Sequence, residues 1–317
     1  MLAARFHDFK APPVVEELEE PRAAEGESLV EVAAAAITHL DLTVASGEFP
    51  RAPSLPYVGG AEGAGRILES ASFDSGTPVR VHGAGVGVVR DGVWAKRIAV
   101  PDAALAPVPA GTSLNVAATY FTTALTAHAA IHEVGGMADG ERVAVLGAAG
   151  AIGAMAARLA QRDGAGQVIG VARSRERAAA IPDGIHAVAL SAPGAREEIR
   201  GPEGVDLLVD TLGGPHLDAI LASAMRPGSR VVLVGYTTGT TLSVELPALM
   251  AADVALLPMN LPNRLPAIEQ HAEEMLGLVE TGELPLELSP VPFAELPQAV
   301  ADLGEQGAVG RLVAELG

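Results

Sequence analysis

Three glycines at regular spacing separate an apolar run from an alanine-rich stretch, and this feature constrains the fold most. Residues 141–155 read ERVAVLGAAGAIGAM, which places glycines at 147, 150 and 153. An apolar run, a turn without side chains and a helix start are typical of a strand–turn–helix unit whose backbone approaches an anion. At Gly150 the missing side chain would admit a pyrophosphate, and at Gly153 it would let the helix pack closely on the strand. The segment predicts a dinucleotide-binding turn, with a purely structural turn as the alternative.

The region around this turn alternates between apolar runs and helix-like stretches. We expect strands at 142–147, 167–171, 187–190, 205–210, 230–235 and about 254–258, with helices at 151–162, 174–180, 214–225 and 245–251. Such alternation is typical of a doubly wound parallel sheet. An alanine-rich segment, 115–134, precedes it with helical spacing and ends at Gly135 and Gly136.

The first hundred residues follow a different pattern. Short apolar or alternating runs at 28–37, 63–70, 77–83 and 94–100 are separated by Gly, Pro and Asp, which predicts a β-rich, barrel-like domain. The tail contains one more expected helix, at 267–280, and two short β-like pieces that could rejoin the first domain. We therefore expect a first domain at 1–113, a dinucleotide-binding domain at 114–258, and a returning tail at 259–317.

The end of the second expected strand discriminates between the two nicotinamide cofactors. Proteins that bind NAD place Asp or Glu there, on the ribose 2′-hydroxyl. Here Ala172 lies near that position, and Arg173, Ser174, Arg175 and Arg177 follow it. Arginine and a hydroxyl would bind a 2′-phosphate, and one charge-assisted contact is worth about 1.5–3 kcal/mol. We predict NADP(H), although an ordinary solvated helix start is the alternative reading of the arginines.

Composition excludes several classes of function. The chain has no cysteine, which excludes disulfides and cysteine-ligated metals. Its net charge of −18 would repel nucleic acid and anionic membranes. No apolar run reaches the ~18 residues of a membrane helix, and the N-terminus has no apolar signal core. We expect a cytoplasmic enzyme without nucleic-acid or membrane partners.

Five segments together resemble the medium-chain dehydrogenase/reductase superfamily, in particular its zinc-free quinone oxidoreductase branch. They are AAITHLDLTVASGEFP (35–50), LPYVGGAEGAGRIL (55–68), VLGAAGAIG (145–153), VDLLVDTLGG (205–214) and RVVLVGYTTG (230–239). The resemblance covers nearly the whole chain. It implies a GroES-like N-terminal domain joined to a Rossmann dinucleotide-binding domain, an α/β fold, and family habit suggests a homodimer.

The residues that bind catalytic zinc in the zinc-dependent members are largely replaced. Thr38 stands at the first cysteine position, and Ala61 replaces the histidine before Glu62. His39 and Glu62 alone could not build the usual site. A further pair, His128 and His132, shares one helix face but has no third ligand nearby in sequence. We expect no bound metal.

Without zinc, the resemblance implies direct hydride transfer from NADPH to a quinone or an α,β-unsaturated carbonyl. The protein would orient the nicotinamide and stabilise the developing oxyanion. Two alternatives remain open. One is a specialised biosynthetic enoyl or enone reductase that acts on one elaborate intermediate, and the other is a cofactor-binding homologue without turnover.

The resemblance also implies site residues. Catalytic candidates are Thr38, Asp41 and Tyr236, although Asp41 could instead orient a loop and Tyr236 could shield the nicotinamide. Candidates for the substrate pocket are His39, Phe49, Tyr57 and Tyr120. Phe49 replaces the tyrosine that thioester reductases of the superfamily use as proton donor, which argues against that mechanism. The cofactor-binding set is Thr123, Thr126, Gly147, Ala149, Gly150, Ala151, Ile152, Gly153, Arg173, Ser174, Arg177, Gly235 and Tyr236, with simple helix packing as the alternative role of the two threonines.

Overall fold

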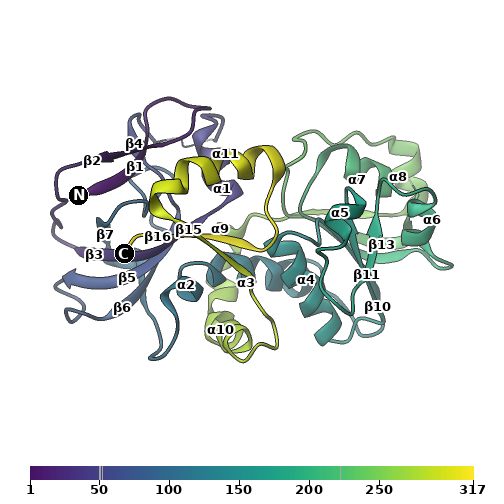
Figure 1. The fold of residues 1–317 in the computed structure, drawn as a ribbon. Coiled ribbons are helices and arrows are strands. Elements are labelled where there is room, and N and C mark those ends of the chain that lie inside the picture. Colours follow the sequence, from purple (N-terminus) through teal and green to yellow (C-terminus); the bar gives the residue numbers. More distant parts are fainter. Residues whose placement is uncertain (50, 52, 222) are drawn as a thin grey trace. The chain divides into compact units, whose positions relative to one another are not determined.

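The computed structural model describes residues 1–49, 51, 53–221 and 223–317 (Figure 1). The chain forms two compact units, which we describe separately. The first combines Met1–Phe121 with Glu287–Gly317, and the second is Thr122–Leu286. The second unit thus extends beyond the expected boundary at residue 258. The reason is that helices α9 (Leu261–Ile268) and α10 (Ala272–Glu280) belong to it, and α10 buries an apolar face there.

The first unit is built on two sheets whose strand pairs are antiparallel, as the alternating runs predict, except that β15 pairs parallel with β16. The larger sheet has the strand order β15-β16-β3-β5-β6-β8, with β7 also paired to β3, and the smaller has the order β2-β1-β4. The strands are β1 (Leu2–Phe6), β2 (Val14–Glu17), β3 (Glu27–Ile37), β4 (Tyr57–Val58), β5 (Glu62–Glu69), β6 (Pro78–His82), β7 (Arg97–Pro101), β8 (Leu105–Pro107), β15 (Leu288–Pro292) and β16 (Arg311–Glu315). Helices α1 (His39–Ala45), α2 (Leu114–Ala117) and α11 (Leu296–Gln306) accompany them.

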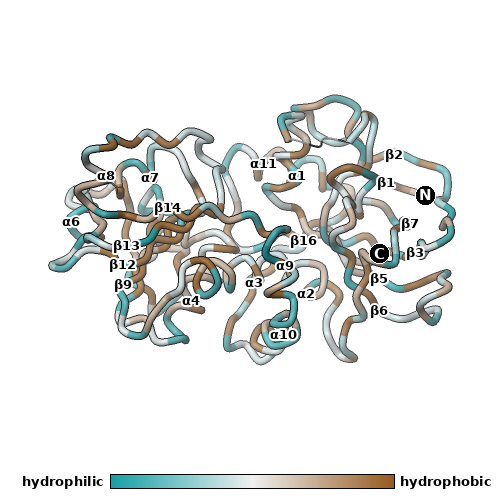
Figure 2. The backbone as a smooth tube through the Cα atoms, turned by 180° about the vertical axis from the view of Figure 1, so that it is seen from behind, coloured by the Kyte–Doolittle hydropathy of each residue, from teal (hydrophilic) through white to brown (hydrophobic). Residues whose placement is uncertain are grey.

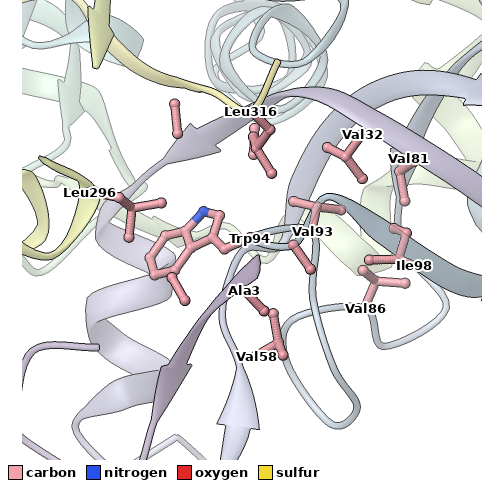
Figure 3. Close-up of a cluster of buried hydrophobic side chains, with 14 of the residues drawn as sticks. Ala3, Val32, Val58, Val81, Val86, Val93, Trp94, Ile98, Leu296 and Leu316 are labelled. Atoms are coloured by element: carbon pink, nitrogen blue, oxygen red, sulfur yellow. The ribbon is translucent and has the colours of Figure 1, made fainter. Parts of the chain in front are cut away.

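The core of this unit joins the two ends of the chain around Trp94, the single tryptophan (Figure 3). Its ring is fully buried, and its Nε1 donates to the Ala36 carbonyl at 2.9 Å. Leu296 and Leu316 come from the C-terminal segment and pack in the same cluster as residues of the N-terminal strands. Strand β16 also pairs antiparallel with β3. The last strand of the chain is therefore an integral part of the first unit.

The second unit contains a six-stranded sheet in the order β11-β10-β9-β12-β13-β14, and every pair in it is parallel. This confirms the predicted doubly wound sheet, and the strand order reverses between β9 and β12. Figure 2 shows the hydrophobic strands at the centre of the unit. The strands are β9 (Arg142–Leu146), β10 (Gln167–Ala172), β11 (His186–Ala189), β12 (Val205–Asp210), β13 (Met225–Leu233) and β14 (Ala255–Pro258).

The helices agree less closely with the sequence pattern. The single helix expected at 115–134 is divided into α2, α3 (Tyr120–His128) and a π-helical turn, η2 (Ala129–Glu133). Two short helices, α1 and α6 (Ala195–Arg200), were not predicted because each is too short to show a helical period. The other helices of the second unit are α4 (Ala151–Arg162), α5 (Arg175–Ala178), α7 (Gly214–Leu221) and α8 (Leu246–Ala252). Within the described residues, no helix is both long and apolar enough to cross a membrane.

Candidate cofactor site

The glycine turn lies between the end of β9 and the first turn of α4, and two of its glycines are required by packing. Gly147 has φ +87°, and a Cβ there would lie 2.2 Å from the Thr211 Oγ1 atom. A Cβ on Gly153 would lie 2.3 Å from the Gly147 carbonyl oxygen. Both distances are far below van der Waals contact, so these two positions exclude any side chain.

Gly150 is different, because nothing in the fold requires glycine there. Its backbone has φ −92° and ψ 164°, an extended conformation open to any residue. The nearest heavy atom to a Cβ at this position would be the Gly147 carbonyl oxygen, at 3.4 Å. Gly150 is the N-cap of the twelve-residue helix α4, and no side chain caps that helix end. Open space in front of uncapped N–H groups is what a phosphate needs, since the helix start offers donors and a partial positive charge.

Strand β12 lies next to β9 in the sheet, so the loop that follows β12 borders the glycine turn at the carboxyl ends of the strands. Asp210, at its carboxyl end, is fully buried and accepts hydrogen bonds from the N–H groups of Leu212 at 2.9 Å and Gly213 at 3.0 Å. Burial raises the pKa of Asp210, and these two hydrogen bonds oppose the rise. Thr211 Oγ1 donates to the Leu146 carbonyl at 2.8 Å. The loops after β9 and β12 are therefore fixed against each other where the strand order reverses, the usual place for a ligand in such sheets.

The loop after β13 joins the same edge. The Asp210 carbonyl accepts from the N–H groups of Val234 at 2.8 Å and Gly235 at 3.2 Å. A Cβ on Gly235 would lie 2.4 Å from the Thr211 carbonyl oxygen, so only glycine fits. Tyr236 follows and is 52% exposed. The predicted residues Gly147, Gly150, Gly235 and Tyr236 thus lie on adjacent loops at the carboxyl edge of one sheet.

The end of β10 carries no acidic side chain. Ala172, the last residue of the strand, is buried. Ser174 caps helix α5, and its side chain accepts from the Arg177 N–H at 3.3 Å. Arg173 is exposed and Arg177 is half-buried. The segment 173–177, which carries arginines and a serine hydroxyl, therefore lies where NAD-binding Rossmann domains have a carboxylate.

The remaining cofactor candidates lie in the second unit as well. Ala151 and Ile152 form the first turn of α4 and are half-buried, and Ala149 in the preceding turn is buried. Thr123 and Thr126 are buried in α3.

The catalytic candidates of the first unit form a capping box at the start of α1. Asp41 Oδ2 accepts from the backbone N–H and the hydroxyl of Thr38, both at 2.8 Å. Its Oδ1 accepts from the Ala61 N–H at 3.0 Å. Burial raises the pKa of Asp41 to about 6, against the effect of these hydrogen bonds and of Arg311. This geometry gives Thr38 and Asp41 a structural role in fixing the loop, which is the alternative left open for Asp41.

An ion pair that the sequence analysis did not anticipate lies in the same unit. Arg311 Nη2 donates to Glu62 Oε2 at 2.9 Å, with both side chains buried. Glu62, the residue left from the zinc motif, is thus held by a guanidinium. The only signal in the sequence is an arginine at the start of the apolar segment GRLVAEL.

The four candidates for the substrate pocket also lie in the first unit. Tyr57 is buried, stacks on Phe6 with ring centroids 5.2 Å apart, and has no hydrogen-bond partner for its hydroxyl among the described residues. Burial raises the pKa of Tyr57. Tyr120 is buried, Phe49 packs against the core, and His39 is exposed. They therefore have different environments, and only the exposed His39 faces solvent directly.

Metal ligands do not gather in the part of the chain that the structure describes. No group of three or more His, Cys, Asp or Glu residues there could hold a metal ion. His271 does join the pair of His128 and His132, which sequence spacing missed, but its ring stacks on His128 at 4.3 Å between centroids. Stacked rings do not direct their nitrogens at one point, as metal ligation requires.

Comparison with known proteins agrees with this architecture. The family model described as "alcohol dehydrogenase GroES-like domain" matches residues 24–110, and the one described as "zinc-binding dehydrogenase" matches residues 164–313. The first match identifies the β-rich unit as GroES-like.

Individual relatives resemble the chain over most of its length. Acryloyl-coenzyme A reductase of Sulfurisphaera tokodaii is 26% identical over 94% of this chain and 95% of that protein. The human synaptic vesicle membrane protein VAT-1 homolog is 25% identical over 92% of this chain and 80% of that protein. The quinone oxidoreductase of Thermus thermophilus, solved also in complex with NADPH, is 27% identical with a TM-score of 0.82 over the whole of both chains. The chain belongs to the medium-chain dehydrogenase/reductase superfamily of oxidoreductases, in its quinone oxidoreductase-like branch.

Proposed function

We propose that this protein binds NADPH at the carboxyl edge of the parallel sheet and reduces a small quinone or α,β-unsaturated carbonyl. The observation that carries the proposal is Gly150. Packing explains the glycines at 147 and 153, but Gly150 has room for a side chain and lies before an uncapped helix start. A ligand that needs this space explains why the position is bare. The cofactor would supply the hydride, and the chain would supply binding, orientation and electrostatic stabilisation.

The roles of the cofactor-binding residues follow from their positions. The N–H groups of Ala151 and Ile152, together with the space at Gly150, would hold the pyrophosphate. Arg173, Ser174 and Arg177 would hold the 2′-phosphate, because charge-assisted bonds from guanidinium to phosphate are strong and directional. The NADPH complex of the Thermus thermophilus relative supports this choice of cofactor.

Among the catalytic candidates, Tyr236 is the one best placed to contact the nicotinamide end of the cofactor. Its exposed ring at the end of β13 would shield the nicotinamide or donate a proton to the reduced substrate. Thr123 and Thr126 would contact the nicotinamide amide. Thr38 is a weaker candidate, because its hydroxyl already donates to Asp41. The acryloyl-coenzyme A reductase among the relatives supports a conjugated double bond as the reducible group.

The substitution Gly150→Ala tests the binding site. The fold admits the methyl group, but alanine is a poorer N-cap than glycine by about 1 kcal/mol, so the melting temperature should fall by no more than about 4 °C. The methyl group would occupy the phosphate space, and the NADPH affinity measured by calorimetry should fall at least tenfold. Gly277→Ala, in helix α10 with open space around it, is the matched control that should bind NADPH normally. Unchanged NADPH affinity in Gly150→Ala would refute the site.

The cofactor preference has its own test. The double variant Arg173→Ala/Arg177→Ala should lose at least about ten- to a hundredfold of the preference for NADPH over NADH, because even one lost charge-assisted bond is worth about 1.5–3 kcal/mol. As a control, Arg264→Ala replaces an exposed arginine of the same unit and should leave the ratio of NADPH affinity to NADH affinity unchanged. An unchanged ratio in the double variant would mean that the 2′-phosphate lies elsewhere.

The substrate class is tested by following NADPH oxidation with a panel of simple quinones and enones. Broad activity supports a general reductase. Tight NADPH binding without turnover would favour the alternatives, a reductase of one elaborate intermediate or a cofactor-binding homologue. Phe49, at the position of a proton-donating tyrosine, and the Thr38-His39-Leu40-Asp41 segment are the features that favour the first of these, the reductase of one elaborate intermediate. Adding candidate intermediates would then separate the two.

We also propose that the protein is a homodimer. Strand β14 ends the six-stranded sheet and, among the described residues, pairs only with β13. Helix α8, beside it in sequence, exposes Leu246 and Met250 by 67% and 79%. An open strand edge with exposed apolar side chains nearby is suited to pairing with a second copy. Analytical ultracentrifugation should give a dimer, and Leu246→Glu/Met250→Glu should shift it to monomer. A wild-type monomer at micromolar concentration contradicts the proposal.

A further inference from the structure

Three histidine rings lie together in the second unit, two from neighbouring turns of one helical segment and the third from far along the chain. His128 ends α3, His132 lies in the π-helical turn η2, and His271 lies in η3 (Glu269–His271), the turn between α9 and α10. The ring centroids of His128 and His271 are 4.3 Å apart with an interplanar angle of 25°. Those of His128 and His132 are 4.9 Å apart. His128 is thus the central ring of the cluster.

The outer two histidines each have a carboxylate partner. His132 Nε2 lies 2.9 Å from Asp163 Oδ2, and His271 Nδ1 lies 3.4 Å from Glu274 Oε2. Asp163 is shared with Arg162, at 2.7 Å. A positive charge on either outer ring would therefore be compensated by a carboxylate.

His128 has no such compensation. Its Nδ1 is buried, and among the described residues no group forms a hydrogen bond with it. The carboxylates of Glu133 and Glu274 favour a charged His128, but only through their fields. The other charged side chains on the elements packed around the cluster are Arg158 of α4, which is half-buried, and the exposed Arg264, Glu269, Glu273 and Glu280.

Protonation of His128 in this arrangement has two costs. A neutral imidazole can keep Nδ1 unprotonated, whereas the imidazolium places an N–H there without an acceptor. The charge would also lie against two other imidazole rings. Burial, together with His132 and His271, lowers the pKa of His128 to about 4, against the opposing fields of Glu133 and Glu274.

The ring as a whole is half-buried. A proton therefore favours any state in which the buried Nδ1 of His128 reaches water. The His271 ring covers one face of His128, so moving η3 away is the shortest route to exposure. Helix α9 also contacts η2, and η3 connects α9 directly to α10. Displacement of η3 would consequently loosen the adjoining turns of both helices.

We propose that the stack of His128, His132 and His271 is an acid-sensitive contact that releases η3 and the adjoining turns of α9 and α10 from α3 and η2. The inference does not depend on the proposed function, because every residue in it lies outside the candidate cofactor site. It assigns a conformational switch to residues that the proposed function does not use.

Hydrogen exchange measured by mass spectrometry on the full chain tests the switch. Between pH 7 and pH 5, protection factors of amides in residues 261–280 should fall by up to about twentyfold, the linkage value for a pKa of about 4 in the closed state and 6.5 in the open state. Partial exposure of the ring reduces this value. Amides of the sheet strands should not change over the same range.

Two variants and a control make the test specific. His128→Phe keeps a ring in the stack but cannot take up a proton, so the pH dependence of protection should disappear. His271→Phe removes the imidazole that stacks on His128 and should weaken the pH dependence of protection. His186→Phe, an exposed histidine paired with Glu198 in the same unit, should behave as wild type.

Titration of the histidine ring signals of the wild-type protein by NMR supplies a readout that needs no variant. The His128 signal should titrate with a pKa of about 4, well below the ordinary value of 6.5. The proposal is wrong if His128 titrates near 6.5, or if protection in 261–280 stays constant from pH 7 to pH 5. It is also wrong if His128→Phe folds and keeps the wild-type pH dependence.

Discussion

Gly153 gives the sharpest test of the packing at the glycine turn, because the structure predicts that alanine there destabilises the fold. In a helix interior, alanine is normally better than glycine by about 1 kcal/mol. At Gly153, however, a Cβ would lie 2.3 Å from the Gly147 carbonyl oxygen and 2.7 Å from its carbonyl carbon. These are backbone atoms, so a side-chain rotation cannot relieve the contact.

The size of the effect follows from two opposing contributions. Overpacking typically costs about 1–3 kcal/mol, and the upper end applies here because the turn or the whole helix must move by close to 1 Å. Subtracting the gain of about 1 kcal/mol in helix propensity leaves a net destabilisation of about 2 kcal/mol for Gly153→Ala. Gly277→Ala, in α10 with nothing within 4 Å of the new Cβ, should instead stabilise by about 1 kcal/mol.

Urea unfolding and thermal scanning of the two variants beside wild type measure this difference. We expect melting-temperature changes of about −4 to −8 °C for Gly153→Ala and +2 to +4 °C for Gly277→Ala. NADPH affinity should fall in Gly153→Ala, because the turn itself is displaced. A Gly153→Ala protein as stable as wild type would show that α4 and the turn do not approach as closely as described, and the packing explanation of this glycine would be wrong.

Three further predictions concern the first unit. Burial raises the pKa of Asp41 from 3.8 to about 6, so the folded chain binds a proton more tightly than the unfolded chain, and the stability that this adds is lost as pH rises through 6. Between pH 4.5 and 7, the unfolding free energy of wild type in urea titrations should therefore fall by about 2 kcal/mol relative to Asp41→Asn. The same pH dependence of the unfolding free energy in both proteins would contradict this. Arg311→Met should lower the unfolding free energy by about 3–5 kcal/mol, because the buried Glu62 carboxylate loses the Arg311 guanidinium. The double variant Glu62→Leu/Arg311→Met should recover most of this loss. If the effects of the two single substitutions simply add in the double variant, the two side chains are not coupled. Gly59→Ala would place a Cβ 2.4 Å from the Trp94 ring and should lower the midpoint of the tryptophan fluorescence transition, while an unchanged midpoint would mean that the ring can move aside.

Much of the candidate site could be predicted because its signals are local. The glycine spacing, the apolar run before it and the absence of an acidic residue after the second strand all lie within about forty consecutive residues. The alternation of strands and helices predicted the parallel sheet, which the structure confirms. A glycine that packing requires and one that a ligand requires look identical in sequence, however. Only the distances from a Cβ built at each position to the surrounding atoms show that side chains are excluded at Gly147 and Gly153 but not at Gly150.

Helix boundaries were less predictable, for a physical reason. The segment 115–134 is alanine-rich and reads as one helix, since alanine favours helix at every position. In the structure it is broken before Tyr120 and widened into a π-helical turn after His128. Composition sets an average preference, whereas the breaks depend on what the segment packs against.

The sequence by itself therefore determined the class of fold and the order along the chain of the strands in the parallel sheet, and it predicted where a dinucleotide would bind, because backbone preference and hydrophobic periodicity act between near neighbours in the chain. Only the tertiary structure decided which charged and aromatic side chains meet. The pair of Arg311 and Glu62 joins residues 249 positions apart, and the stack of His128 with His271 joins different helical segments. Such contacts exist only once the chain has closed on itself, so no local pattern records them.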